Sequence, residues 1–290
     1  CYDHHRPTRF MGTKLGIEKT CANGVSVGYT YHSHFDDYAA HYLPWFPQTW
    51  LRWAYRRASR ILYDAVDQLI LPTAEMTAVL LKYGIQTHST VLPTGVDLTE
   101  FVAGDGAAFR ARHDIAAERP VLVTISRLAV EKNIAFLLQM VRVLIQAFPD
   151  LLFVISGEGP DAPRLHALAK TLGLERNVLF LGNLDRTTEL PACYRAADVF
   201  VFASPTETQG LVLIEAMAVG VPIVSTAVLG TAAVLRHANG AIVSPQDVRA
   251  FAHCVAGVLR DRDLRESLDA SSLRDAQAWS SEDVMKQAMA

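Results

Sequence analysis

Two glutamates, Glu207 and Glu215, flank seven residues in a polar turn and the helix expected after it. Ahead of them, residues 198–203 form an apolar run of strand length, and a helix is predicted from Gly210 to about Gly220. The N–H groups and dipole at such a helix start attract an anion, and the glycine lets a phosphate approach the backbone. Carboxylates beside a phosphate suit sugar hydroxyls, since each accepts hydrogen bonds from two neighbouring hydroxyls. The stretch therefore favours a ligand with both phosphate and sugar.

A second charged element, S-R-L-A-V-E-K-N, follows a strand predicted at 121–126. Arg127 leaves the end of this strand, and Lys132 stands at the start of the next helix. Two cations at one sheet edge suit a diphosphate, which carries charge on both phosphoryl groups. The alternatives are a solvated charged loop here and, at Glu207, an ordinary turn with surface glutamates.

The string S-P-T-E-T-Q-G-L-V-L-I-E-A-M-A around both glutamates resembles the nucleotide-sugar site of the retaining family-4 glycosyltransferases, which have the GT-B fold. The resemblance implies that Glu215 binds the ribose hydroxyls and that Glu207 reaches the transferred sugar. It also implies that backbone donors to the phosphates come from Gln209, Gly210 and Leu211.

The charged element resembles the G-R-x-x-x-E-K-N element of the same family, with Ser126 in place of the usual glycine. The resemblance implies that Arg127 and Lys132 bind the donor diphosphate and stabilise charge on the leaving group. No aspartate pair is placed for Mg²⁺, so neither a metal nor another cofactor is expected. Gly157 lies in a G-E-G-P turn that the family has near the nucleotide, and it is counted with the donor-binding residues.

A histidine completes the predicted site. Tyr29-Thr-Tyr-His-Ser33 resembles the family segment Y-T-x-H-T, whose histidine contacts the donor sugar. His32 lies just past a strand predicted at 25–31, at the edge where open α/β sheets bind ligands. The predicted catalytic residues are therefore His32, Arg127, Lys132 and Glu207; His34 is a weaker candidate, and a structural histidine is the alternative.

The elements that must position these side chains alternate between strand and helix. Strands are predicted at 25–31, 67–71 and 89–92, with helices at 48–63 and 73–83, and then at 121–126, 151–156, 178–181, 198–203, 222–226 and 240–243, each followed by a helix. This alternation predicts an α/β protein with parallel sheets covered on both faces. With the resemblance, it implies a GT-B architecture of two Rossmann-like domains that face each other across a cleft.

The predicted domains are a partial acceptor-side domain at 1–100, a linker at 101–120, a nucleotide-sugar-binding domain at 121–278 and a tail or crossover helix at 279–290. The family places further strands and a Gly-rich loop ahead of the segment matching Val25, so a truncated first domain is expected. Near the second site, Leu229-Gly-Thr-Ala-Ala233 replaces the usual G-G-x-P-E.

Composition narrows the class of protein. The chain has 290 residues, 50% of them hydrophobic, a net charge of −3 and a pI near 6.4. There is no basic field for nucleic acid. The four cysteines show neither CxxC nor metal-ligand spacing, which indicates reduced thiols of a cytoplasmic protein.

The helix predicted at 48–63 carries a possible membrane surface. Trp50 and Trp53 lie beside Arg52, Arg56 and Arg60, a composition typical of an interfacial helix, and the segment also resembles enzymes that glycosylate diacylglycerol. The expectation is a peripheral protein on the inner face of the cytoplasmic membrane, which contacts anionic lipid. A first-domain helix with its aromatic residues in the core is the alternative.

The resemblance implies transfer of a hexosyl group from a UDP- or GDP-sugar to a lipid or glycan acceptor, with retention of the anomeric configuration. One alternative is a catalytically inactive, truncated nucleotide-binding fragment that acts as an interaction module. Another is a sugar or sugar-phosphate synthase of the same fold, which differs only in its acceptor.

Overall fold

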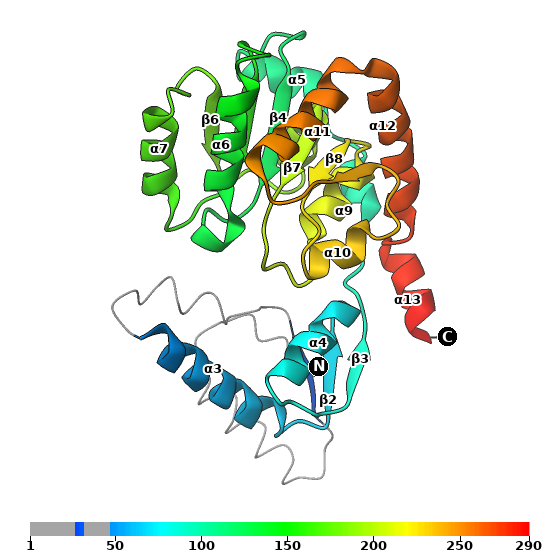
Figure 1. The fold of residues 1–290 in the computed structure, drawn as a ribbon. Helices are drawn as coiled ribbons and strands as arrows, with labels where there is room; N and C mark the ends of the chain where they lie inside the picture. Colours follow the sequence, from blue (N-terminus) through cyan, green and yellow to red (C-terminus); the bar gives the residue numbers. More distant parts are fainter. Residues whose placement is uncertain (1–26, 32–46, 290) are drawn as a thin grey trace. The chain divides into compact units, whose positions relative to one another are not determined.

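The structure is a computed structural model that describes residues 27–31 and 47–289. The chain divides into two compact units, 1–93 and 94–290. Figure 1 shows the elements of both units along the chain. The stretch 101–120, expected to connect two domains, lies within the second unit.

The first unit contains three described parallel strands in the order β1-β2-β3. The strands are β1 (Gly28–Thr30), β2 (Gln68–Leu71) and β3 (Ser89–Val91), with helices α3 (Gln48–Tyr63) and α4 (Ala74–Lys82) between them. Tyr31 and Tyr63 are buried edge to face, with ring centroids 5.8 Å apart. These elements match the predicted ones to within a few residues.

The second unit is built on six parallel strands in the order β6-β5-β4-β7-β8-β9. The strands are β4 (Val121–Ile125), β5 (Leu152–Ser156), β6 (Val178–Gly182), β7 (Val199–Phe202), β8 (Ile223–Ser225) and β9 (Ala241–Val243). The helices are α5 (Gly106–Arg112), α6 (Ile134–Leu144), α7 (Ala162–Thr171), α8 (Glu189–Arg195), α9 (Leu211–Ala218), α10 (Gly230–Leu235), α11 (Val248–Arg260), α12 (Arg262–Gln277) and α13 (Ser281–Met289). Short 3-10 turns are η1 (Leu98–Phe101) and η2 (Val130–Lys132).

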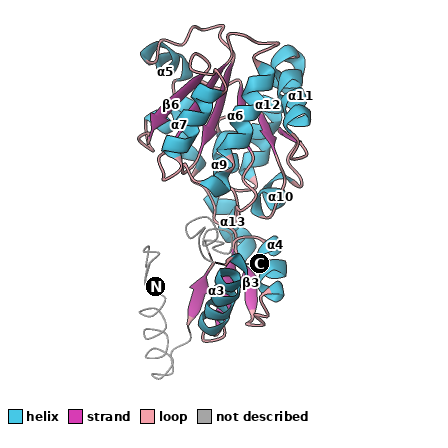
Figure 2. Ribbon diagram, turned by 60° about the vertical axis from the view of Figure 1, so that its left-hand side comes forward, coloured by secondary structure: helices cyan, strands magenta, loops and turns pink. Residues whose placement is uncertain are grey.

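Apolar side chains of this sheet point alternately to its two faces, as strand geometry requires. Leu122 and Phe153 pack with helices α6, α7 and α11 on one face, whereas Val121 and Val123 pack with α8 and α9 on the other. Figure 2 shows the strands enclosed between the helices. Burial on both faces explains why the strands are continuous apolar runs, and the predicted α/β class with parallel sheets is confirmed.

The strand order places a topological switch point between β4 and β7. From β4 the chain proceeds outward through β5 and β6, and from β7 it proceeds in the other direction through β8 and β9. Helices that follow β4 and β7 therefore cover opposite faces, and in open α/β sheets ligands bind beside the carboxyl ends of two such strands. The residues predicted to bind the diphosphate and the sugar follow these two strands.

The ends of the second unit are joined to each other. Val96 and Ser280 form a parallel bridge, and the Val96 N–H donates to the Trp279 carbonyl at 2.9 Å. A Cβ atom on Gly95 would lie 2.5 Å from the Ser281 Cα, so only glycine fits there. The segment that enters the unit is thus held beside the start of α13.

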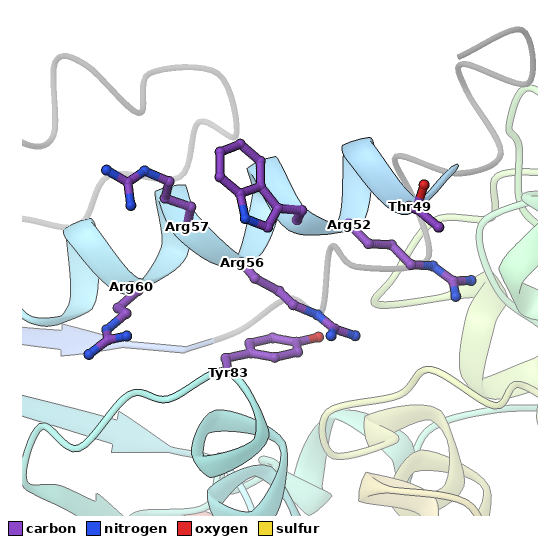
Figure 3. A pocket seen from close by; sticks show the side chains of 7 residues that line it. Thr49, Arg52, Arg56, Arg57, Arg60 and Tyr83 are labelled. Atoms are coloured by element: carbon purple, nitrogen blue, oxygen red, sulfur yellow. The ribbon is translucent and has the colours of Figure 1, made fainter. Parts of the chain in front are cut away.

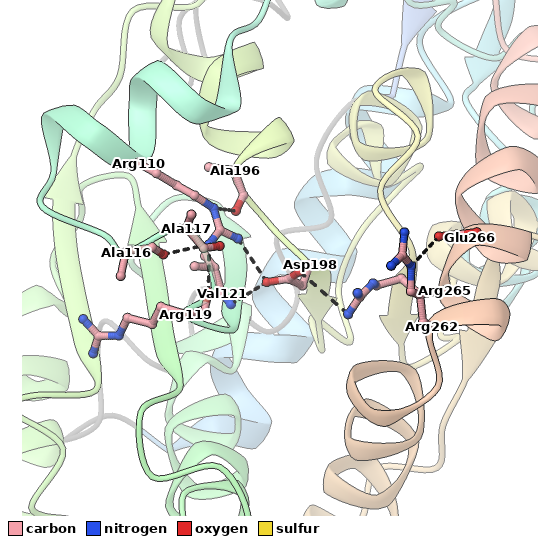
Figure 4. A network of polar contacts seen from close by, with 10 residues as sticks. All are labelled: Arg110, Ala116, Ala117, Arg119, Val121, Ala196, Asp198, Arg262, Arg265 and Glu266. Atoms are coloured by element: carbon pink, nitrogen blue, oxygen red, sulfur yellow. Dashed lines mark hydrogen bonds and ion pairs between the residues drawn. The ribbon is translucent and has the colours of Figure 1, made fainter.

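A half-buried carboxylate, that of Asp198, connects the starts of two strands at the amino-terminal edge of the sheet (Figure 4). The Asp198 Oδ2 accepts a hydrogen bond from the Val121 N–H at 2.8 Å and another from Arg110 at 3.0 Å. Arg110 also donates to the carbonyls of Ala196 and Arg119, and Arg265 approaches the Asp198 Oδ1 at 3.8 Å. This network joins the starts of β4 and β7 to α5 and α12.

Asp269 lies near this network and gives a pH-dependent contribution to stability. Burial raises its pKa to about 6; Arg265 lowers the pKa, whereas Asp198 and Glu266 raise it. The folded state therefore binds a proton more tightly than the unfolded state, and this group favours folding less as the pH rises from about 4 to 6. We expect Asp269→Asn to stabilise the protein at pH 8 by about 1 kcal/mol, a value discounted for solvent screening.

Thermal unfolding across pH 4–8 measures this effect. The melting temperature of Asp269→Asn should exceed that of wild type by about 2–4 °C at pH 8, and the difference should vanish towards pH 4. The exposed Glu175→Gln substitution is the control, and it should show no such trend. An Asp269→Asn variant that is less stable at pH 8 would contradict the prediction.

Candidate functional site

The loops after β4 and β7 contact each other at the switch point. The Lys132 Nζ forms an ion pair with the Glu207 Oε1, and both side chains are mostly buried. The Asn133 side chain donates to the Ala203 carbonyl at 3.2 Å, and the Ser204 hydroxyl donates to the Glu131 carbonyl at 3.3 Å. Two of the predicted catalytic residues, 75 positions apart in the chain, are thereby brought together.

The turn that carries Glu207 leads into an open helix start. Gly210, the N-cap of α9, has φ +87°, a conformation that favours glycine, and it has no side chain to cap the helix. The first N–H groups of α9 therefore have no side-chain cap, and such groups are the ones that bind an anion at a helix start. Leu211, the first helical residue, is 37% exposed.

Gly230 contacts the backbone of the turn that carries Glu207. Its N–H donates to the Glu207 carbonyl at 2.8 Å, and a Cβ atom on it would lie 2.2 Å from the Thr208 carbonyl carbon. The fully buried Thr231 hydroxyl accepts a hydrogen bond from the Val228 N–H at 2.8 Å. The L-G-T-A-A segment, which departs from the family pattern, thus supports the backbone of the glutamate turn.

The Gln209 side chain binds a backbone segment far away in the chain. Its Oε1 accepts from the Thr94 N–H at 2.9 Å, and its Nε2 donates to the Thr94 carbonyl at 2.8 Å. Gln209 is 3% exposed, so this pair of hydrogen bonds is shielded from water. The predicted phosphate loop is therefore fastened to the first residue of the second unit.

Arg127 and Gly157 lie at the ends of the adjacent strands β4 and β5. Arg127 is exposed. Gly157 has φ +126°, and a Cβ atom on it would lie 2.0 Å from the Ser126 carbonyl oxygen. Its N–H donates to the Gly182 carbonyl at 2.7 Å. Glycine is therefore required at position 157 because the ends of β4 and β5 pack too closely for a side chain.

Glu215 is buried in the second turn of α9 and contacts two side chains. Its Oε2 accepts a hydrogen bond from the Tyr194 hydroxyl at 2.9 Å, and its Oε1 pairs with Arg186 at 3.1 Å. Burial raises the pKa of Glu215, whereas Tyr194 and Arg186 lower it and Glu100 raises it; the net shift is upward. Burial likewise holds the pKa of Tyr194 far above its usual range.

The sequence did not predict Arg186, Tyr194 or the Thr94 backbone as parts of the site, and Gly230 belonged to a segment noted only for its departure from the family pattern. Arg186 lies in the loop after β6, and it was one arginine among many; Tyr194 was one aromatic residue of a predicted helix. Neither carries a short motif, and each meets Glu215 only through the fold, 29 and 21 positions away.

His32 and His34 lie outside the described residues. Within the part of the chain that the structure describes, no three His, Cys, Asp or Glu side chains converge as metal ligands. Over the same residues, no helix combines the length and the apolar character that crossing a membrane requires.

Two family profiles match the chain. Glycosyl transferases group 1 matches residues 105–273, and Glycosyltransferase Family 4 matches residues 5–100. Among curated proteins, the D-inositol 3-phosphate glycosyltransferase of Corynebacterium urealyticum is 34% identical over 241 residues, 78% of this chain and 56% of that protein. The alpha-monoglucosyldiacylglycerol synthase of Streptococcus pneumoniae is 29% identical over 232 residues, 76% of this chain and 51% of that protein. The chain thus spans about half the length of these curated relatives.

Among solved structures, HepE of Anabaena in complex with UDP and glucose superposes with a TM-score of 0.81 at 19% identity. The match covers 97% of this chain and 74% of HepE. At this identity the likeness concerns the fold, and it confirms the GT-B fold that the sequence motifs implied.

The cations at the switch point make a testable prediction about anion binding. Lys132→Ala and Arg127→Ala should each weaken binding of a nucleoside diphosphate by about tenfold or more, because each removes a charge-assisted contact. Binding of the matching nucleoside should change little. Calorimetric titration measures both affinities, with the exposed Lys170→Ala as control. Equal losses for nucleoside and diphosphate would place these side chains away from the phosphates.

Proposed function

The chain belongs to the glycosyl transferases group 1 family, and we propose that it transfers a hexosyl group from a UDP- or GDP-sugar to a lipid acceptor with retention of configuration. A glycan acceptor is the second possibility within the same proposal. The observation that carries the proposal is the meeting of Lys132, Glu207 and the open start of α9 at one switch point.

The charges at this point suit a nucleotide diphosphate sugar. We assign the diphosphate to Arg127, Lys132 and the backbone N–H groups of residues 209–211, and the ribose hydroxyls to Glu215. Glu207, in the turn just before the helix start that is assigned to the phosphates, would then face the transferred sugar. Since the cations and N–H groups supply the positive charge that a departing diphosphate needs, the proposed reaction requires no metal ion.

In the proposed reaction the bond between the sugar C1 and the diphosphate oxygen breaks as the acceptor oxygen bonds to C1 on the same face. The acceptor hydroxyl gives its proton to the departing phosphate oxygen, so no side-chain base is needed. Arg127 and Lys132 stabilise the negative charge on the diphosphate, and the Glu207 carboxylate stabilises positive charge on the sugar ring. His32 is assigned to the donor sugar by its motif alone.

A lipid acceptor is supported by the surface of α3 (Figure 3). Four arginines and Tyr83 line a groove of about 450 Å³ with Thr49 and Trp53; the arginines are Arg52, Arg56, Arg57 and Arg60. Arg56 lies 5.2 Å from the Tyr83 ring centroid. Trp50 and Trp53 are 66% and 59% exposed, so the predicted alternative with these rings in the core is wrong.

An arginine-rich groove beside exposed indoles suits the headgroup region of an anionic bilayer, where the rings enter the interface and the cations meet phosphates. The opposite face of α3 carries Leu62, which is 5% exposed, so one face of the helix is buried and the other is open to water. We therefore propose that the protein is peripheral to the cytoplasmic membrane and reaches its acceptor there.

Titration with UDP, GDP and their glucose and mannose derivatives tests the donor site. We expect binding between micromolar and millimolar, about −8 to −4 kcal/mol. Glu215→Gln should weaken UDP or GDP, whereas Glu207→Gln should leave nucleotide affinity near wild type and lower the rate of transfer. If the folded chain bound none of these compounds, the proposed donor site would be wrong. Binding without transfer to diacylglycerol or a glycan would favour a nucleotide-binding module.

Co-sedimentation with vesicles tests the lipid surface. Vesicles that contain phosphatidylglycerol should bind the chain, neutral vesicles should not, and binding should fall with salt because exposed cations supply the attraction. Changing Arg52, Arg56 and Arg60 together to glutamine should abolish binding. The same change at the exposed Lys170, Arg249 and Arg262 of the second unit removes equal charge and should preserve it. Salt-independent binding would contradict the role of the arginines, and no binding to either kind of vesicle would point to a soluble acceptor.

A further inference from the structure

The partners of Glu215 differ sharply in how freely they can move. Tyr194 is fully buried, and its ring packs edge to face on Phe101 and tilted on Phe200, with centroids 6.3 Å and 5.4 Å away. The side chain of Arg186, within the loop between β6 and α8, is 58% exposed. One partner is therefore fixed by the core, and the other is a long side chain in contact with water.

Arg186 also has other contacts close to the carboxylate. Its Nε lies 3.4 Å from the Glu100 Oε2, and its guanidinium carbon lies 5.9 Å from the Phe101 ring centroid. If the Arg186 guanidinium moved away from Glu215, it would therefore keep two favourable contacts, the Glu100 carboxylate and the face of the Phe101 ring.

The Glu215 side chain is 6% exposed while Arg186 covers it. A ribose that offers two hydroxyls needs both carboxylate oxygens, and Oε1 is occupied by the guanidinium whereas Oε2 is held by Tyr194. Each carboxylate oxygen has two lone pairs, so Oε2 can accept a ribose hydroxyl beside the tyrosine. At Oε1 the guanidinium takes one lone pair and helps to leave the side chain only 6% exposed, so a ribose hydroxyl that binds there has to displace it.

We propose that Tyr194 is a positioning residue that fixes Glu215 for the ribose, and that Arg186 is an exchangeable cover which the ribose hydroxyls displace. The proposal rests on the proposed function, because it takes a nucleoside diphosphate as the ligand. Arg186 then keeps the buried carboxylate ionised in the empty site and moves to Glu100 and Phe101 when the nucleotide binds.

The charge of Glu215 gives the proposal a pH signature. The titratable and charged groups that face it are Tyr194 of α8, Arg186 of the preceding loop and Glu100 of η1. Removing Tyr194 or Arg186 takes away a group that lowers the Glu215 pKa, so the carboxyl should gain a proton at a higher pH. A protonated carboxyl accepts fewer hydrogen bonds from ribose.

Ribose selectivity measures this directly. It is the ratio of affinities for UDP and for 2′-deoxy- or 3′-deoxy-UDP, or for the GDP series if GDP binds more tightly, measured by calorimetry at pH 6 and pH 8. Tyr194→Phe should lower the ratio about tenfold at pH 8 and further at pH 6. Arg186→Leu should keep the wild-type ratio at pH 8 within about twofold and lose it at pH 6. The controls, Tyr55→Phe and Arg249→Leu, should match wild type.

Three outcomes would overturn the proposal. An unchanged ratio in Tyr194→Phe would remove its positioning role, and a ratio lost at pH 8 in Arg186→Leu would make Arg186 a direct ribose ligand. A ratio that Arg186→Leu preserves at pH 6 would remove its effect on the carboxylate, and this result would overturn the proposal even if Tyr194→Phe fails to fold. Absence of any nucleotide binding in wild type would instead refute the proposed function.

Discussion

The contact between the loops after β4 and β7 is the interaction on which the candidate site depends. These strands are neighbours in the sheet although they lie about 75 residues apart in the chain. Their side-chain and backbone contacts unite the cation of one loop with the carboxylate of the other. Both side chains are mostly buried, so water screens the ion pair only in part, and removing either partner would leave a costly unpaired charge. A ligand that offers a phosphate to Lys132 and hydroxyls to Glu207 could give each side chain a new partner in place of their ion pair.

The turn that carries Glu207 needs contacts from other segments, because a short irregular turn has no regular series of backbone hydrogen bonds of its own. Gly230 supports the Glu207 carbonyl, and Gln209 fastens the turn to Thr94. Thr94 begins a segment that in turn pairs through Val96 with Ser280. The glutamate turn is thus joined both to the entrance of the second unit and to the start of its last helix.

Much of this fold follows from local sequence patterns. The buried strands are short apolar runs, and the helices between them end near glycines, so the alternation and the parallel sheet could be predicted. The spacing of Glu207 and Glu215 follows from one turn and one helix, which is local information as well. By contrast, α5 lies in a stretch rich in alanine and glycine that indicated a linker, and it packs on α8 through Phe109. The partners of Glu215 and Gln209 could not be predicted, because those contacts join residues 21 to 115 positions apart.

The two glutamates show how one side-chain type acquires different properties at one site. Glu207 keeps 17% of its side chain exposed and is neutralised by a lysine, so its charge is compensated without deep burial. Glu215 is more deeply buried, and a hydroxyl and an exposed guanidinium offset only part of the desolvation. A carboxylate whose one ionic partner is a lysine that a phosphate can also bind would be able to respond to charge that develops during a reaction. One held by a fixed tyrosine would, under the proposed function, offer the same oxygens to ribose before and after transfer. The difference in their partners, more than the spacing between them, therefore separates a residue suited to the transition state from one suited to uniform binding.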